Sequence, residues 1–501
     1  KLPMFYEGRG YQGAQGKIYP YEWHDLLTDN KVDRDYKAVY LENDYIKLCV
    51  IPELDGRLFS ALDKTNDYDF FYRQSVIKNV LIGSTAAWIS GGIEWNFPHH
   101  HRASTYEMMD HVIKENPDGS KTVWIGETEK RQRLRWLVGV TIFPDRSYFE
   151  AEIKIFNPTP FVTSFLYFAN PAVHVDETYQ VLFPPETEYA TQHAKSQFVE
   201  WPYAKGRYGR WNYKGKDASL WRNLETPVSF FCWDHDSDYF AGYDHGKDAG
   251  TAYVANRHIA PGKKFFTFGS GYEVKMWDRI LTDDDGPYLE LMAGGYSDNQ
   301  PDYSWLQPYE VKSLKQYWFP IRDLQGMVFA NLNGAMNLKI TKDNVSELRL
   351  NATTEYEDAK VKLTADGESL YESTIDISPA EPFGHDVKLP TGVKETDLRL
   401  SLVSSDGKEL MAYQPKEKAG SPMPEPVEPP KPPKEVETIE ELYYTGLRLD
   451  EFHNSRVYSL PYYTEALKRD PTDYRCNTRL GLYYLKRGDY DRSEQYLRTA
   501  V

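Results

Sequence analysis

The segment with the most reactive side chains lies between residues 88 and 102 and reads WISGGIEWNFPHHHR. Aromatic faces stack on the apolar C–H surface of a sugar ring, and polar side chains bind its hydroxyl groups. The segment therefore predicts the mouth of a carbohydrate site. Its predicted ligand-binding residues are Trp88, Trp95, His99, His100, His101 and Arg102, with Glu94 as a candidate catalytic acid or base.

A second segment, residues 276–320, also combines acids with aromatic residues. Glu290 stands between two leucines in an expected strand, so its side chain faces opposite to theirs. Such an acid either faces water or serves a site. The functional interpretation is favoured by Tyr296 and Trp305 downstream, which supply further stacking faces.

These acids suggest a two-carboxyl mechanism. Glycosidases use one protonated and one ionised carboxyl group, and Glu290 could form such a pair with Glu94 or Glu310. An apolar wall made by Trp88 and Trp95 would raise the pKa of the acid and keep it protonated. The distance between the two carboxyl groups would decide between retention and inversion of the anomeric configuration.

The three histidines also allow a metal-site interpretation. His99 and His101 share a face if this segment is extended, and together with Glu94 they could bind zinc. Contacts to sugar hydroxyls are the favoured alternative, so we expect neither a metal nor a cofactor. The acidic turn at residues 283–286 lacks the ligand spacing of a calcium loop.

Composition limits the function classes. The 501 residues carry a net charge of −16, which disfavours nucleic-acid backbones and anionic membranes as partners. Three scattered cysteines provide neither a disulfide framework nor a cysteine zinc site. No apolar run is long enough for a membrane span. We expect a periplasmic protein from which a signal peptide has been removed, with the cytoplasm as the alternative.

Hydrophobic periodicity divides the chain into five parts. After an N-terminal arm at residues 1–38, residues 39–325 alternate with period two between short turns, which predicts a large antiparallel β-supersandwich. Shorter strands over residues 326–414 predict an immunoglobulin-like β-sandwich. Residues 415–437 are proline-rich and predict a semi-rigid spacer.

Residues 438–501 change to a helical period. Leu480-Gly481 and Tyr484 fit the L-G-x-x-Y packing positions of a tetratricopeptide repeat, and an alanine recurs after 34 residues, at Ala466 and Ala500. Such arrays need about three repeats for stability. We therefore expect the array either to continue beyond residue 501 or to lean on the sandwich, and to offer a surface for a protein partner.

Residues 289–301, LELMAGGYSDNQP, followed by LQPYE and KQYWFP, are similar in order and spacing to a late strand of galactose mutarotases. There LETQGxxDxxNxP precedes LxPGE and an aromatic strand. IPELDGRLFSALD resembles the opening G-G-R-I strand, with Arg57 in the matching place as a ligand-binding residue. The whole architecture resembles bacterial mutarotase-like domains followed by tetratricopeptide repeats. The resemblance spans residues 41–321 and implies that Glu290 is the catalytic base.

One family motif is missing. Mutarotases present H-x-x-H-G-G before the mid-sheet, whereas this chain keeps the glycine pair and lacks both histidines. The acid must then come from Glu94, from one of the three adjacent histidines, or from His174. Our leading hypothesis is a glycoside hydrolase acting on a glycan. The alternatives are an aldose 1-epimerase that uses His174 or His100 as its acid, and an inactive carbohydrate-binding or scaffold protein.

Overall fold

The computed structural model describes residues 21, 28, 30–78, 88–99, 101–102, 104–130, 132–299, 302–451 and 457–501. His100 and most of the arm predicted for residues 1–38 lie outside the described residues. In the part of the chain that the structure describes, no helix has both the length and the apolar character needed to cross a membrane.

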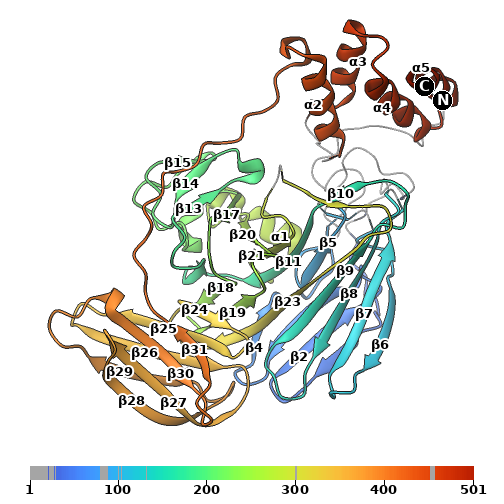
Figure 1. The fold of residues 1–501 in the computed structure, drawn as a ribbon. Coiled ribbons are helices and arrows are strands. Elements are labelled where there is room, and N and C mark those ends of the chain that lie inside the picture. Colours follow the sequence, from blue (N-terminus) through green and yellow to red (C-terminus); the bar gives the residue numbers. More distant parts are fainter. Residues whose placement is uncertain are drawn as a thin grey trace.

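Two large antiparallel sheets form the main body (Figure 1). The first, called here the site sheet, contains in spatial order β1 (Val39–Glu42), β2 (Ile46–Ile51), β3 (Arg57–Asp63), β5 (Ile93–Asn96), β11 (Tyr167–His174), β21 (Tyr288–Gly295), β20 (Gly262–Thr267), β17 (Val228–Trp233), β13 (Tyr189–Thr191) and β14 (Phe198–Glu200), with β4 (Tyr68–Phe71) beside β3. The second, called the back sheet, contains β12 (Tyr179–Leu182), β18 (Tyr239–Asp244), β19 (Ala249–Val254), β23 (Val311–Arg322), β9 (Phe149–Phe156), β8 (Arg135–Ile142), β7 (Lys121–Thr128) and β6 (Asp110–Glu115).

Short elements complete the body. Two small ladders form its rim, β10 (Thr163–Phe165) with β22 (Ser304–Leu306), and β15 (Arg207–Tyr208) with β16 (Trp211–Asn212). In the described part of this body, the strands are connected by α1 (Met276–Thr282), η2 (His193–Lys195), η3 (Trp221–Asn223) and η4 (Tyr272–Val274).

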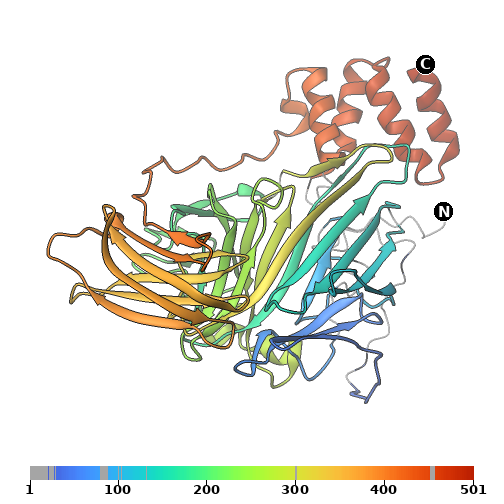
Figure 2. The ribbon, with the colours of Figure 1, turned by 60° about the horizontal axis from the view of Figure 1, so that its bottom comes forward.

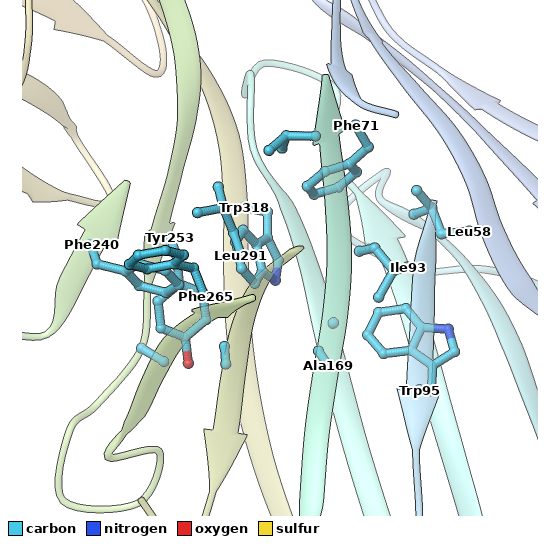
Figure 3. Close-up of a cluster of buried hydrophobic side chains, with 14 of the residues drawn as sticks. Leu58, Phe71, Ile93, Trp95, Ala169, Phe240, Tyr253, Phe265, Leu291 and Trp318 are labelled. Carbon is cyan, nitrogen blue, oxygen red and sulfur yellow. The ribbon is translucent and has the colours of Figure 1, made fainter. Parts of the chain in front are cut away.

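The hydrophobic core lies between the two large sheets. Phe71 of the site sheet packs against Phe149 and Trp318 of the back sheet, with ring centroids 6.0 and 5.8 Å apart. Figure 3 shows Ile93 and Trp95 of β5 entering this layer from the site sheet. Trp95 is fully buried there, so the prediction that it binds the ligand is wrong. Neighbouring residues on a strand face opposite sides, and Trp95 therefore faces away from the side that Glu94 occupies.

Two smaller units follow the main body. The first is a second β-sandwich made of two sheets. One sheet contains, in spatial order, β24 (Phe329–Asn331), β25 (Gly334–Ile340), β26 (Val345–Ala352) and β29 (Phe383–Lys388). The other contains β28 (Glu368–Ile377), β27 (Tyr356–Ala365), β30 (Leu398–Val403) and β31 (Glu409–Tyr413). The 3-10 turn η5 (Glu395–Asp397) lies between β29 and β30 of this sandwich. The second unit contains the C-terminal helices α2 (Ile439–Glu451), α3 (Leu460–Arg469), α4 (Tyr474–Leu485) and α5 (Tyr490–Ala500), preceded by the 3-10 turn η6 (Pro433–Glu435). The predicted fold class, mainly β with a helical C-terminal part, is confirmed.

The proline-rich segment runs along the main body between these two units (Figure 2). The Tyr189 hydroxyl donates a hydrogen bond to the Ser421 carbonyl over 2.6 Å, and the Val427 N–H donates to the Lys195 carbonyl over 2.9 Å. Ser164 at the rim hydrogen-bonds the carbonyl of Glu451 at the end of α2. The segment and the first helix thus dock on the same body that carries the site sheet.

The core position of Trp95 generates a stability prediction. Trp95→Ala should lower the free energy of unfolding of the sandwich by about 3–5 kcal/mol, because it removes a fully buried indole and leaves a cavity. Urea unfolding followed by far-UV circular dichroism measures this loss. Tyr272→Ala is the matched control, since this ring is exposed and its removal should change stability by less than about 0.5 kcal/mol. Equal effects of the two substitutions would contradict the assignment.

Candidate active site

Strand pairing places three charged side chains on the outer face of the site sheet. Glu94 of β5 lies opposite Asn170 of β11, and Glu290 of β21 lies opposite Ala172 of the same strand. Directly paired residues share a face, so both carboxyl groups project from the side away from the core. Lys264 of β20, opposite Met292, shares this face. Strand spacing and the two-residue offset put the Cα atoms of the two glutamates about 12 Å apart.

Glu94 forms a buried ion pair with His101. The His101 Nδ1 lies 2.9 and 3.1 Å from the two carboxylate oxygens, and the Asn170 amide donates to the same carboxylate over 3.3 Å. Burial by itself would raise the pKa of Glu94, but His101 and Arg57 outweigh it and lower this pKa. Burial would likewise lower the pKa of His101, and the carboxylates of Glu94 and Glu290 raise it. These opposite shifts favour an imidazolium beside a carboxylate.

Glu290 has the opposite electrostatic character. Its side chain is buried and accepts a hydrogen bond from the Tyr288 hydroxyl over 3.4 Å. Burial and the nearby charge of Glu94 raise the pKa of Glu290, while His101 and Lys264 act against this rise. A carboxyl group whose pKa is raised by burial is a competent general base or acid near neutral pH.

An aromatic wall borders these groups. The Trp88 indole lies 5.8 Å from the Tyr288 ring, 6.2 Å from the Phe268 ring and 6.1 Å from the His101 imidazole, measured between ring centroids. Trp277 of α1 stacks on Phe268 at 4.5 Å. Trp88 is buried and adjoins the charged cluster, and the second ring of this wall is Tyr288, not Trp95.

The two predicted arginines occupy different places. Arg57 donates to the Gly91 carbonyl over 2.6 Å, and its charge acts on the pKa of both Glu94 and Glu290. Arg102 forms ion pairs with Asp55 at 3.3 Å and Glu127 at 3.2 Å. Its guanidinium also covers the Trp136 ring at 4.2 Å. Arg102 thus stabilises the loop that carries His101, which corrects the predicted ligand contact.

His174 lies at the end of β11 on the same face as Glu290. Its ring stacks on Tyr72 at 3.9 Å, and its Nε2 accepts the Arg73 N–H over 3.3 Å. Burial lowers the pKa of His174 to about 4. A neutral imidazole is a much weaker proton donor than an imidazolium, so His101 is the better candidate for the acid.

The other predicted residues lie at the rim or beyond it. His99 is buried, with its ring nitrogens 3.3 Å from the Ser164 hydroxyl and 3.1 Å from the Gln132 amide. Tyr296 donates to the Ser313 carbonyl over 2.6 Å, and Trp305 lies opposite Ser164 in the small β10–β22 ladder. These contacts give the three residues structural roles at the rim.

Glu310 does not join Glu290. Its carboxylate accepts the Gln307 N–H over 2.6 Å in the turn that enters β23 of the back sheet. The pairing of Glu310 with Glu290, which the sequence analysis considered, is therefore wrong. Among the described residues, no group of three or more His, Cys, Asp or Glu side chains is arranged to hold a metal ion.

Two residues that the sequence analysis missed belong to the cluster. Lys264 lies in the run GKKFFT, where alternation puts it on the same face as Phe266 and, across the strands, Glu290. His193 of η2 lies with its Nε2 3.4 Å from the Lys264 Nζ. Alternation on a strand of known register could have identified Lys264, whereas nothing in the sequence points to His193.

Comparison with known proteins identifies the family. Residues 14–321 match the model of a family described as a domain of unknown function, DUF5107, and the chain belongs to this family. Residues 329–413 match the second domain of YphG-like proteins. Residues 462–495 match a tetratricopeptide repeat, which confirms that part of the resemblance. Tetratricopeptide arrays form extended concave surfaces for binding other proteins.

Solved structures show related folds. A TPR-domain containing protein from Parabacteroides distasonis is 17% identical, with a TM-score of 0.55 over 99% of this chain and 77% of that chain. Slr1438 from Synechocystis is 10% identical over 60% of this chain and 100% of that one, with a TM-score of 0.43. A putative mutarotase, YeaD, from Salmonella typhimurium is 8% identical over 61% and 98%, with a TM-score of 0.42. At 17% identity, the likeness to the Parabacteroides protein concerns the fold alone.

The ion pair generates a prediction that does not depend on any substrate. In a titration of the histidine ring signals by NMR, His101 should lose its proton at a higher pH than an ordinary histidine, because two carboxylates face it. Glu94→Gln should move this midpoint to lower pH. Glu310→Gln, whose carboxylate lies in a distant turn, should leave it unchanged. A midpoint of His101 that ignores Glu94→Gln would contradict the ion pair.

Proposed function

We propose that the site sheet carries an aldose 1-epimerase-like enzyme, in which Glu290 is the base and His101 is the acid. The observation that carries this proposal is the contact of the His101 Nδ1 with both carboxylate oxygens of Glu94. A carboxylate in this position orients the imidazole and stabilises its protonated form. The cluster then offers one carboxyl group and one imidazolium for proton transfer, instead of two carboxyl groups.

The proposed chemistry needs only these two proton carriers. Glu290 removes the proton from the anomeric hydroxyl of a cyclic sugar, while His101 gives its proton to the ring oxygen as the bond from the anomeric carbon to that oxygen breaks. The open-chain aldehyde rotates, and the ring closes on its other face with the two roles reversed. The buried indole of Trp88 forms part of the apolar wall beside these two groups.

Glycoside hydrolysis is the second candidate, favoured by two buried carboxyl groups, Glu94 and Glu290, on one face of one sheet. In this mechanism Glu290 would protonate the departing oxygen, and Glu94 would attack the anomeric carbon or activate water. The His101 contact with both Glu94 oxygens weakens this alternative, because an ion-paired carboxylate is a poorer nucleophile and base.

Substitution of the base tests the proposal. Glu290→Gln should slow the interconversion of α and β anomers by about 10²–10⁴-fold, because the amide cannot accept the proton. Exchange NMR or polarimetry of a panel of free sugars measures this rate. Glu310→Gln should retain full activity. Release of reducing ends from oligosaccharides, without accelerated anomer exchange, would instead establish the hydrolase.

The shifted pKa values predict the form of the pH–rate profile. Activity should rise with pH as Glu290 loses its proton, at a pH higher than for an ordinary glutamate, because burial raises its pKa. Activity should fall as His101 loses its proton, at a pH above that of an ordinary histidine. Glu94→Gln should move the alkaline limb to lower pH. The acidic limb should still lie at a higher pH than for an ordinary glutamate. An alkaline limb that is insensitive to Glu94→Gln would exclude His101 as the acid.

A further inference from the structure

Lys264 brings a buried positive charge to the same face as Glu290. Its side chain projects from β20, which pairs with β21, the strand that carries Glu290. Lys264 is only 9% exposed. Its Nζ lies 4.6 Å from the centre of the Phe231 ring and 5.2 Å from that of Phe168. Aromatic faces attract an ammonium group, but they do not neutralise its charge.

The ammonium group of Lys264 lacks a carboxylate partner. Within the described residues, no carboxylate oxygen lies within 4.0 Å of its Nζ, and its hydrogen-bond partner is the Nε2 of His193 at 3.4 Å. Burial lowers the pKa of Lys264, and the more remote charge of Glu290 opposes this effect. A buried ammonium without an ion pair costs stability, which a protein tolerates where a ligand supplies the missing charge.

The loop that carries His193 is fixed in place. Its ring packs edge-on against Phe231 at 4.9 Å. Two residues further along η2, the Lys195 Nζ donates to the carboxylates of Asp298 over 3.2 Å and Asp302 over 2.6 Å. Both aspartates belong to the loop that follows β21, the strand of Glu290. The imidazole is therefore positioned beside Lys264 by contacts that no ligand needs to make.

We propose that Lys264, oriented by its contact with His193, binds a carboxylate group of the substrate, so that the site acts on sugar acids of the uronate class. This inference rests on the proposed function, in which Glu290 and His101 act at the anomeric carbon. The strand order β5, β11, β21, β20 places Glu94, Glu290 and Lys264 in sequence across the sheet. A sugar ring that spans this row has its anomeric carbon near Glu290 and His101 and its acidic group above β20.

A carboxylate fits Lys264 better than a phosphate does. The Lys264 ammonium directs one N–H at the His193 Nε2, and its single full charge and remaining N–H donors match the two oxygens of a carboxylate. A phosphate dianion carries more charge and a third acceptor oxygen, and it is usually bound by several cations or by backbone N–H groups.

Direct binding measurements test the inference independently of turnover. Isothermal titration calorimetry compares D-glucuronate, D-galacturonate, D-glucose and D-glucose 6-phosphate on the full chain. A uronate should bind about 10- to 100-fold more tightly than glucose, the effect expected for one charged hydrogen bond. Lys264→Met should remove this preference, so that the uronates no longer bind more tightly than glucose. Lys312→Met is the matched control, since this lysine lies at the rim over Tyr296.

The outcomes separate this inference from the proposed function. Uronate binding that depends on Lys264, without anomer exchange, would support the sugar-acid site and contradict the epimerase. Anomer exchange of glucose and glucuronate at equal rates would support the epimerase and overturn the sugar-acid site. Tighter binding of glucose 6-phosphate than of either uronate would also overturn it. If Lys264→Met does not fold, His193→Ala should weaken uronate binding alone, and an unchanged uronate preference in that variant would contradict the inference.

Discussion

The buried ion pair between Glu94 and His101 is the interaction on which the site depends. Two charges can leave water only if each neutralises the other and further hydrogen bonds satisfy the remaining oxygens. The amide of Asn170 donates such a hydrogen bond to Glu94, and the nearby charge of Arg57 further stabilises the carboxylate. The same pair then sets the electrostatics of Glu290, because the Glu94 carboxylate raises the pKa of Glu290 and the His101 imidazolium opposes the rise.

The sandwich gives this cluster a rigid base. Strands β5, β11 and β21 lie side by side in the middle of the site sheet, and their inward residues belong to the large core between the two sheets. The outward carboxyl groups of Glu94 and Glu290 are therefore held at fixed spacing, which carboxyl groups on flexible loops would not achieve. The Arg102 contacts with Asp55 and Glu127 fix the loop that brings His101 back over the strand of Glu94.

Much of the site could be predicted from the sequence because the relevant patterns are local. Glu290 stands between two leucines that face the core, so alternation places its carboxyl group on the outer face of the strand. Trp88 and His101 are indicated by the many aromatic and ionisable residues of their segment. The same rule of alternation should have excluded Trp95, which directly follows Glu94. Other failures have a different cause. Glu310 and His174 have suitable chemistry by residue type, but their partners, Gln307 and Tyr72, are set by turns and tertiary contacts.

The sequence by itself determined the classes of element, because the periods of hydrophobic and turn residues are properties of neighbouring positions. These are the long run of antiparallel strands, the short second sandwich, the proline-rich segment and the repeat helices. Only the tertiary structure decided which charged groups meet. Glu94, His193, Lys264 and Glu290 come from different parts of the chain, and their meeting depends on strand order across the sheet. Long-range strand order leaves no periodic signal in a single sequence, since it is fixed by which faces the whole core can bury together.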